Sequence, residues 1–134
     1  MVFDLVELTL DNMNNSSYSI FMVWEVETTE EYDVWFLDQD DDGQASIRMK
    51  VELLGEYGPL LPRPYVDTLK GSKISNLKEL RTQTENHVFR IAFLFDKKRK
   101  AVLLIGGDKK GKNKERFYRN LIKEAEKIYA GYRK

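Results

Sequence analysis

Asn86-His-Val-Phe-Arg-Ile-Ala-Phe-Leu-Phe-Asp-Lys-Lys-Arg-Lys-Ala-Val-Leu-Leu-Ile-Gly-Gly107 carries the clearest structural signal in this chain. Two apolar runs, at about 87–95 and 100–106, flank the charged turn Asp96-Lys-Lys-Arg99, a pattern typical of a β-hairpin. The Gly-flanked lysines of Asp108-Lys-Lys-Gly-Lys-Asn-Lys114 follow at once. Arg90 lies inside the first strand, where a plain core would place an apolar residue. The hairpin therefore looks suited to holding an anion.

The segments around the hairpin predict a small α+β domain. After it, an apolar stripe at helical spacing predicts a helix over about 114–132 that packs on the sheet; the stripe consists of Phe117, Leu121, Ala125, Ile128 and Tyr132. Before it, we expect a strand at 23–28, a helix from Thr29, a second helix over 44–57, a Pro-rich loop at 60–72 and a short strand at 77–81. The order is β-α-α-β-β-β-α, with the last three strands forming an antiparallel meander.

Length and composition indicate one soluble domain. The chain has 134 residues, no cysteine and one histidine, so thiolate metal sites and thiol catalysis are excluded. No apolar run approaches the roughly 20 residues of a membrane span, and no secretory signal is visible, so we expect a cytoplasmic protein. Residues 1–21 read as an N-terminal extension or the product of an upstream start, and 22–134 as the domain proper.

The zero net charge conceals a strong asymmetry along the chain. Residues 1–67 carry 3 basic and 15 acidic side chains, whereas residues 68–134 carry 19 basic and 7 acidic ones. Such a distribution indicates a basic surface on the C-terminal half, of the kind that binds phosphates or nucleic acid. The alternative is that the acidic half simply neutralises the basic half within the fold.

Three motifs each allow a specific functional interpretation and an ordinary structural one. Gly106-Gly-Asp-Lys-Lys-Gly-Lys-Asn113 approaches a P-loop, but Asn113 lacks the hydroxyl that ligates magnesium and no βαβ unit follows. The acidic run at 38–43 lacks the ligand spacing of an EF-hand and reads as a solvated helix junction. His87 reads as an ordinary strand residue. The lysines and the strand arginines therefore favour phosphate binding, without choosing between binding and cleavage.

Several motifs resemble, in order and spacing, the RelE/ParE superfamily of type II toxin–antitoxin toxins, and more narrowly its phage-derived HigB-like branch. They span about 22–134 and are Trp24-Glu-Val-Glu27, Tyr57-Gly-Pro59, Arg63-Pro-Tyr-Val-Asp-Thr-Leu-Lys-Gly-Ser72, Leu77-Lys-Glu-Leu-Arg81, Phe89-Arg-Ile-Ala-Phe-Leu-Phe-Asp96 and Leu103-Leu-Ile-Gly-Gly-Asp-Lys109. The resemblance implies a two-helix hairpin packed on a small antiparallel sheet with a C-terminal helix. It further implies a metal-independent, cofactor-free messenger RNA endonuclease that works on the ribosome.

In such enzymes the RNA 2′-hydroxyl attacks the adjacent phosphate, with protein groups as base, cations and acid. By motif, Arg90 matches the arginine that holds the scissile phosphate, and Arg81 a basic position on the preceding strand. Lys109, Lys110 and Lys112 stand in the loop where RelE places its transition-state arginine, and Tyr118 matches the C-terminal tyrosine near the nucleophile. Glu79 occupies a lysine position of RelE, which leaves Lys78 as a shifted candidate. Further RNA-phosphate contacts are expected from Lys110, Lys112 and Lys114.

The resemblance also implies partners. A helix-turn-helix antitoxin would neutralise the toxin and carry it to operator DNA, and the ribosome and mRNA would be its targets; a homodimer and a toxin–antitoxin hetero-oligomer both stay open. The histidine-containing catalytic loop of other HigB toxins is replaced here by Gly-Gly-Asp-Lys. Two alternatives therefore stand beside the endonuclease: a ParE-like poison of DNA gyrase, and a catalytically degenerate member that binds antitoxin or nucleic acid.

Overall fold

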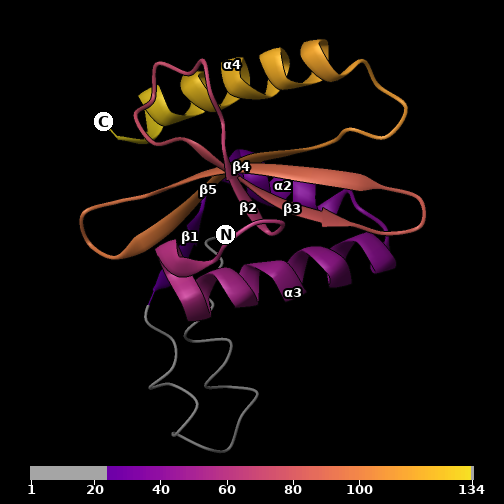
Figure 1. The fold of residues 1–134 in the computed structure, drawn as a ribbon, viewed down its shortest axis with the longest axis horizontal. Coiled ribbons are helices and arrows are strands. Elements are labelled where there is room, and N and C mark those ends of the chain that lie inside the picture. Colours follow the sequence, from indigo (N-terminus) through magenta and orange to yellow (C-terminus); the bar gives the residue numbers. More distant parts are fainter. Residues whose placement is uncertain (1–23, 134) are drawn as a thin grey trace, which may run out of the picture.

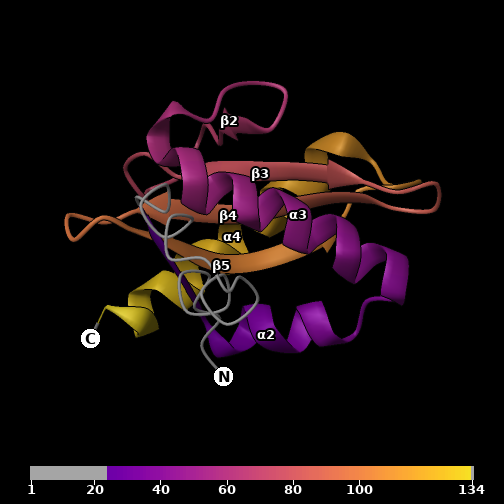
Figure 2. The ribbon, with the colours of Figure 1, turned by 90° about the horizontal axis from the view of Figure 1, so that it is seen from below.

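The computed structural model describes residues 24–133, and the expected N-terminal extension and domain start fall outside that range. The described residues form a five-stranded sheet in the order β1-β5-β4-β3-β2. Its strands are β1 (Glu25–Thr28), β2 (Val66–Thr68), β3 (Lys78–Gln83), β4 (Val88–Phe95) and β5 (Lys100–Asp108). Helices α2 (Glu30–Leu37) and α3 (Asp41–Tyr57) lie across one face, and α4 (Lys114–Tyr132) lies across the other (Figures 1 and 2).

This architecture confirms the predicted α+β order and adds two features. First, the sheet is mixed, because β1 runs parallel to β5 while the other three pairings are antiparallel. Second, Val66–Thr68, inside the predicted loop, pairs with Lys78–Leu80 as the short edge strand β2. A short 3₁₀ turn, η2 (Gly58–Leu60), ends α3. None of the described helices is long and apolar enough to cross a bilayer.

The hairpin at the centre of the sheet is in the expected place. β4 and β5 pair from Phe89↔Asp108 to Phe95↔Ala101, with one bulge beside Ala92 and Phe93. The turn is stabilised by Asp96, whose side chain accepts hydrogen bonds from the Lys98 and Lys100 N–H groups at 2.8 and 3.0 Å. Asx turns of this kind are a common way to close a polar connection.

Two apolar clusters hold the layers together. Under α3, the buried Ile47, Val51 and Leu54 pack on the face of the sheet that presents Phe89, Ile91 and Phe93. On the opposite face, the α4 stripe packs on a second set; the stripe residues are Phe117, Leu121, Ala125 and Ile128, and the sheet residues are Ala92, Leu94, Val102 and Leu104. The prediction for Tyr132 is wrong: it is 39% exposed and lies outside the buried stripe, and its hydroxyl donates a hydrogen bond to Glu27 of β1.

The two glycines of Gly106-Gly107 are packing residues. A Cβ on Gly106 would lie 2.3 Å from the indole of Trp35 in α2, and one on Gly107 would lie 3.0 Å from the Phe117 ring of α4. Neighbouring positions on a strand face opposite sides of the sheet, so each glycine admits an aromatic ring on its own face. The pair therefore lets both helical layers approach the end of β5 closely.

Candidate functional site

The predicted catalytic residues begin with two arginines that stand side by side. In the register of β3 and β4, Arg81 lies directly opposite Arg90. Arg90 is buried, with 6% of its surface exposed, whereas about a third of the Arg81 side chain is open to solvent. Like charges directly opposite one another on a sheet destabilise it, so this pairing requires an anion nearby.

Glu79 supplies that anion. It lies two positions before Arg81 on β3, hence on the same face, and it is 5% exposed. Its Oε1 lies 3.5 Å from Arg90 Nε, and its Oε2 lies 4.0 Å from Arg81 Nε. Both arginines therefore pair with a carboxylate on their own sheet.

Tyr118 closes the cluster from α4. Its hydroxyl donates a hydrogen bond to Glu79 Oε1 at 2.8 Å and accepts one from Arg90 Nε at 3.2 Å. Arg90 also donates from Nη1 to the Phe89 carbonyl at 2.9 Å, so its guanidinium is held at two points. Burial raises the pKa of the Tyr118 phenol, and the hydrogen bond to Glu79 raises it further. Tyr118 is therefore a proton-bearing hydroxyl at neutral pH.

Lys109 reaches the same cluster from the loop after β5. Its Nζ lies 5.7 Å from the centre of the Tyr118 ring, within range of a cation–π contact. Burial lowers the pKa of Lys109, and the positive charges of Arg90 and then Arg81 lower it further. A lysine in this state gives up its proton more readily than a solvated one. The four residues predicted as catalytic thus converge on one site, which we call the Glu79 cluster.

The lysine loop is held in place by Asp108, the acidic residue of Gly-Gly-Asp-Lys. Its Oδ1 accepts hydrogen bonds from the N–H groups of Val88 at 2.9 Å and Lys110 at 3.0 Å. Lys109 N–H donates to the Val88 carbonyl at 2.7 Å, which fixes the backbone from which its side chain extends. The Asn113 side chain then caps α4 by accepting from the Arg116 N–H at 2.9 Å. Asn113 is thus a helix cap rather than a failed magnesium ligand.

His87 is more than an ordinary strand residue. Its Nδ1 lies 2.7 Å from Asp108 Oδ2, its Nε2 lies 3.0 Å from Asp40 Oδ2, and its ring stacks on Phe89. The hydrogen bond to Asp108, followed by that to Asp40, raises the pKa of His87. Asp40 also caps α3, with its Oδ1 accepting from the Gly43 N–H at 2.7 Å. His87 therefore joins the helical hairpin to the residue that organises the lysine loop.

The other predicted phosphate contacts are dispersed. Lys114 opens α4, and its charge contributes to lowering the pKa of Lys109. Lys110 Nζ bonds the Glu85 carbonyl at 2.8 Å, and Lys112 Nζ lies 6.0 Å from the centre of the Phe117 ring. Lys78 is adjacent to Glu79 on β3, so strand alternation points it to the opposite face of the sheet.

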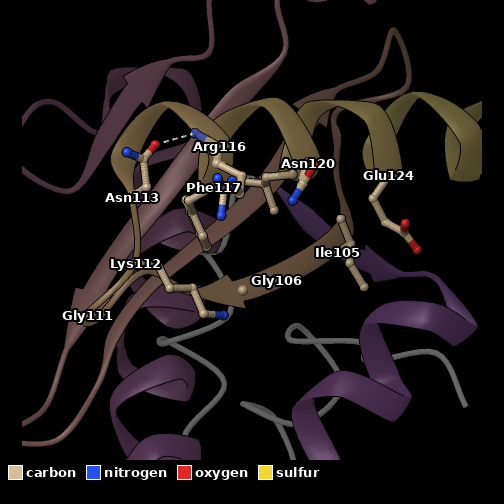
Figure 3. A pocket seen from close by; sticks show the side chains of 11 residues that line it. Ile105, Gly106, Gly111, Lys112, Asn113, Arg116, Phe117, Asn120 and Glu124 are labelled. Carbon is tan, nitrogen blue, oxygen red and sulfur yellow. Dashed lines mark hydrogen bonds between the residues drawn. The ribbon is translucent and has the colours of Figure 1, made fainter.

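Two hollows lie beside these elements. One, of about 660 Å³, runs between β5 and α4 (Figure 3), with Ile105 and Gly106 along β5 and Arg116, Asn120 and Glu124 along the helix. Lys112 lies beside it (Figure 3). The other, of about 360 Å³, lies at the free edge of β3 and is lined by both arginines of the Glu79 cluster. Within residues 24–133, no group of three or more His, Asp or Glu side chains is arranged to hold a metal ion.

Sequence reasoning singled out the arginines, Lys109 and Tyr118, but it noted Glu79 only as a departure. The available signal was the spacing in Lys78-Glu-Leu-Arg81, which places Glu79 and Arg81 on one face of a strand. The convergence on Tyr118 depends on how α4 crosses the sheet, and no local pattern contains that information.

Comparison with known proteins gives a consistent result. The family described as phage-derived protein Gp49-like (DUF891) matches residues 34–130. Over 88 residues, the chain is 44% identical to the Mycobacterium tuberculosis protein named "Putative toxin HigB3", covering 66% of this chain and 75% of that protein. Over 102 residues it is 35% identical to "Putative toxin HigB2" of the same organism, covering 75% of this chain and half of that relative. No solved structure matches at the same stringency.

Proposed function

Because this chain belongs to the phage-derived Gp49-like family, we propose that it is the toxin of a type II toxin–antitoxin system, acting as a ribosome-dependent mRNA endonuclease. The toxin names of its M. tuberculosis relatives support the first part. The observation that carries the second is the Glu79 cluster, in which a carboxylate, two arginines, a lysine and a phenol meet at one end of the sheet. A small helix-turn-helix antitoxin would be the neutralising partner and the link to operator DNA.

The reaction needs a proton acceptor at the 2′-hydroxyl, and the cluster offers one. Glu79 is the one carboxylate of the cluster and Tyr118 keeps its proton at neutral pH, so Glu79 would be the base of the set. The proton would pass from the 2′-oxygen to the carboxylate, either directly or through the Tyr118 hydroxyl that already donates to it at 2.8 Å. A general base of this kind contributes typically 10²–10⁴-fold to a rate.

The cations would act on the phosphate and on the leaving group. Glu79 positions both arginines, Arg90 through its Oε1 and Arg81 through its Oε2. The two guanidinium groups would stabilise charge on the non-bridging oxygens as the 2′-oxygen bonds to phosphorus. Lys109, whose pKa is lowered by burial and by the arginines, would protonate the 5′-oxygen as its bond to phosphorus breaks. The products would be a 2′,3′-cyclic phosphate and a 5′-hydroxyl, with no metal in any step.

Induction in growing cells tests this proposal. Wild type is expected to arrest growth and to yield mRNA cut within codons, seen by mapping RNA 5′ ends, while Arg90→Ala and Tyr118→Phe are expected to abolish or greatly reduce both. Arg119→Ala is the matched control, because Arg119 neighbours Tyr118 on α4 but is exposed.

Three results would contradict the endonuclease. Growth arrest with intact mRNA would exclude cleavage. Arrest with DNA breaks and an SOS response, retained in Arg90→Ala, would indicate a gyrase poison. Unaffected growth, together with binding to an antitoxin, would indicate a degenerate member of the family.

A further inference from the structure

The groove at the free edge of β3 is a second recognition element beside the Glu79 cluster. β2 pairs only with Lys78–Leu80, and the Arg81 N–H bonds the Tyr65 carbonyl, so within the described residues no strand covers the outer edge of Thr82 and Gln83. The hollow there has a volume of about 360 Å³, at the small end of the range for small-molecule pockets. Arg81, Arg90 and Tyr65 are among the residues that line it. The groove is therefore continuous with the cationic part of the cluster.

Tyr65 gives this groove an aromatic platform on a fixed backbone. Its carbonyl accepts a hydrogen bond from the Arg81 N–H at 2.8 Å, and its own N–H donates to the Pro62 carbonyl at 3.0 Å. The residue is nevertheless 36% exposed, and the Lys50 Nζ lies 6.0 Å from the centre of its ring. An anchored, half-open ring with cations beside it is the kind of surface on which an unpaired nucleobase stacks.

The polar groups around Tyr65 suit a nucleotide better than an apolar peptide. Gln83 is exposed at the end of β3, and its amide offers one acceptor and two donor hydrogens, the complement of a base edge. Arg81 belongs to both sites, because it lies beside Glu79 in the cluster and also lines the groove. A phosphate held by Arg81 and Arg90 would thus lie next to a site for the base attached to it.

We propose that this groove is a nucleobase subsite, in which the base flanking the scissile phosphate stacks on Tyr65 and is contacted at its edge by Gln83. The inference rests on the proposed RNA-cleaving function and deepens it, since Tyr65 and Gln83 would then set the nucleotide preference at the cut. Exposed tyrosine and arginine also suit protein interfaces, and antitoxin binding by Tyr65→Ala separates that alternative.

The test uses the purified full chain and fluorescein-labelled hexaribonucleotides of A, C, G or U, made 2′-O-methyl so that 2′-hydroxyl attack is blocked. Loss of one stacked base corresponds to a roughly five- to hundredfold rise in Kd. Tyr65→Ala should show a rise of that order for the preferred oligonucleotide, and Tyr65→Phe, which keeps the ring, should bind as wild type does. Tyr57→Ala is the control, because Tyr57 is 49% exposed at the end of α3 and does not line the groove.

The Gln83→Ala variant tests base recognition separately from overall RNA affinity. It should flatten the ratios of Kd among the four oligonucleotides, whereas Arg90→Ala should weaken all four alike, because a phosphate contact carries no sequence information. In cells, mapped cleavage sites should lose base preference at one flanking position in Gln83→Ala. Circular dichroism of each variant confirms that the fold is intact.

Three outcomes would overturn the subsite. If Tyr65→Ala binds RNA as wild type does while Arg90→Ala is weakened, the subsite is wrong and the proposed function stands. A Tyr65→Ala variant that keeps its RNA affinity but no longer binds the antitoxin would make the groove a protein interface. If wild type neither binds the oligonucleotides nor cuts mRNA in cells, the subsite and the proposed function fall together.

Discussion

On one face of the sheet, β4 presents Phe89, Ile91 and Phe93, and all three are completely buried. On the other face the same strand presents Arg90, Ala92 and Leu94, of which only the last two join the apolar cluster under α4. The first face is closed along its whole length. The second is divided: α4 covers its apolar part, and the remainder holds the Glu79 cluster. A single strand thus supplies stability on one side and chemistry on the other.

The difference lies in how each face compensates for burial. The face under α3 excludes water with apolar side chains, which need no partners beyond close contact. The cluster on the other face buries Glu79 and Arg90, and such charges are tolerated only when each is paired and hydrogen-bonded. Removing a buried side chain should therefore affect the free energy of unfolding differently on the two faces.

The largest effect is expected on the apolar face. Phe93→Ala removes a fully buried ring and leaves a cavity, so the free energy of unfolding should fall by about 3–5 kcal/mol. Chemical denaturation followed by circular dichroism measures this. Met49→Ala on the exposed side of α3 is the control and should change stability by less than about 0.5 kcal/mol. Equal losses in both variants would contradict the assignment of the core.

Breaking the charged cluster should cost somewhat less, and the cost should be recoverable. Arg90→Met leaves Glu79 buried with a weakened set of partners and should lower the free energy of unfolding by about 3 kcal/mol. Adding Glu79→Leu removes the buried charge that has lost its Arg90 partner, so the double variant should regain most of that stability in the same denaturation assay.

Toxicity should not recover with stability when Glu79→Leu is added to Arg90→Met. The double variant should remain inactive in the growth-arrest assay although it is stable, because the base and the phosphate-binding cation are both gone. A stable double variant that still arrests growth would show that the cluster is structural and not catalytic.

A smaller effect is expected where the two faces meet at the end of β5. Gly106→Ala places a Cβ against the Trp35 ring at 2.3 Å, and the repacking should cost about 1–3 kcal/mol. Gly131→Ala is the matched control, since a Cβ there meets nothing within 4 Å in a helix, and it should be neutral or slightly stabilising. Thermal melting of both variants distinguishes packing from a general intolerance of alanine.

The smallest effect is a pH dependence from His87, which joins Asp108 at the end of β5 to Asp40 at the start of α3. Only the doubly protonated ring can donate to both carboxylates, in keeping with a pKa raised above 6.5 by the hydrogen bonds to Asp108 and Asp40. A raised pKa stabilises the fold fully below about pH 6.5, and this contribution is lost as pH rises through the folded-state value. The melting temperature of wild type relative to His87→Gln should therefore decline between pH 6 and pH 9; a constant difference would contradict the clamp.

Periodicity alone was sufficient for much of this fold. The bounds of α4 and the pairing of β4 with β5 were predicted closely, because an apolar stripe and an apolar hairpin are local signals. The edge strand Val66–Thr68 was missed, since three residues between prolines and glycine carry almost no pattern and pair only because β3 is adjacent. Tyr132 fits the helical stripe, yet it is 39% exposed and its hydroxyl donates to Glu27 of β1.

The sequence of this protein settles which side chains are available and which of them share a face: Glu79 with Arg81 by strand alternation, and Phe117 with Leu121 by helical spacing. It does not settle which faces meet. The contact of Tyr118 with Glu79, of His87 with Asp40, and of Tyr65 with the arginine-lined groove depends on the crossing of α4, the hairpin of α2 and α3, and the path of the chain into β2. Those long-range arrangements follow from burying two apolar clusters at once, a condition that the whole chain satisfies and no single segment encodes.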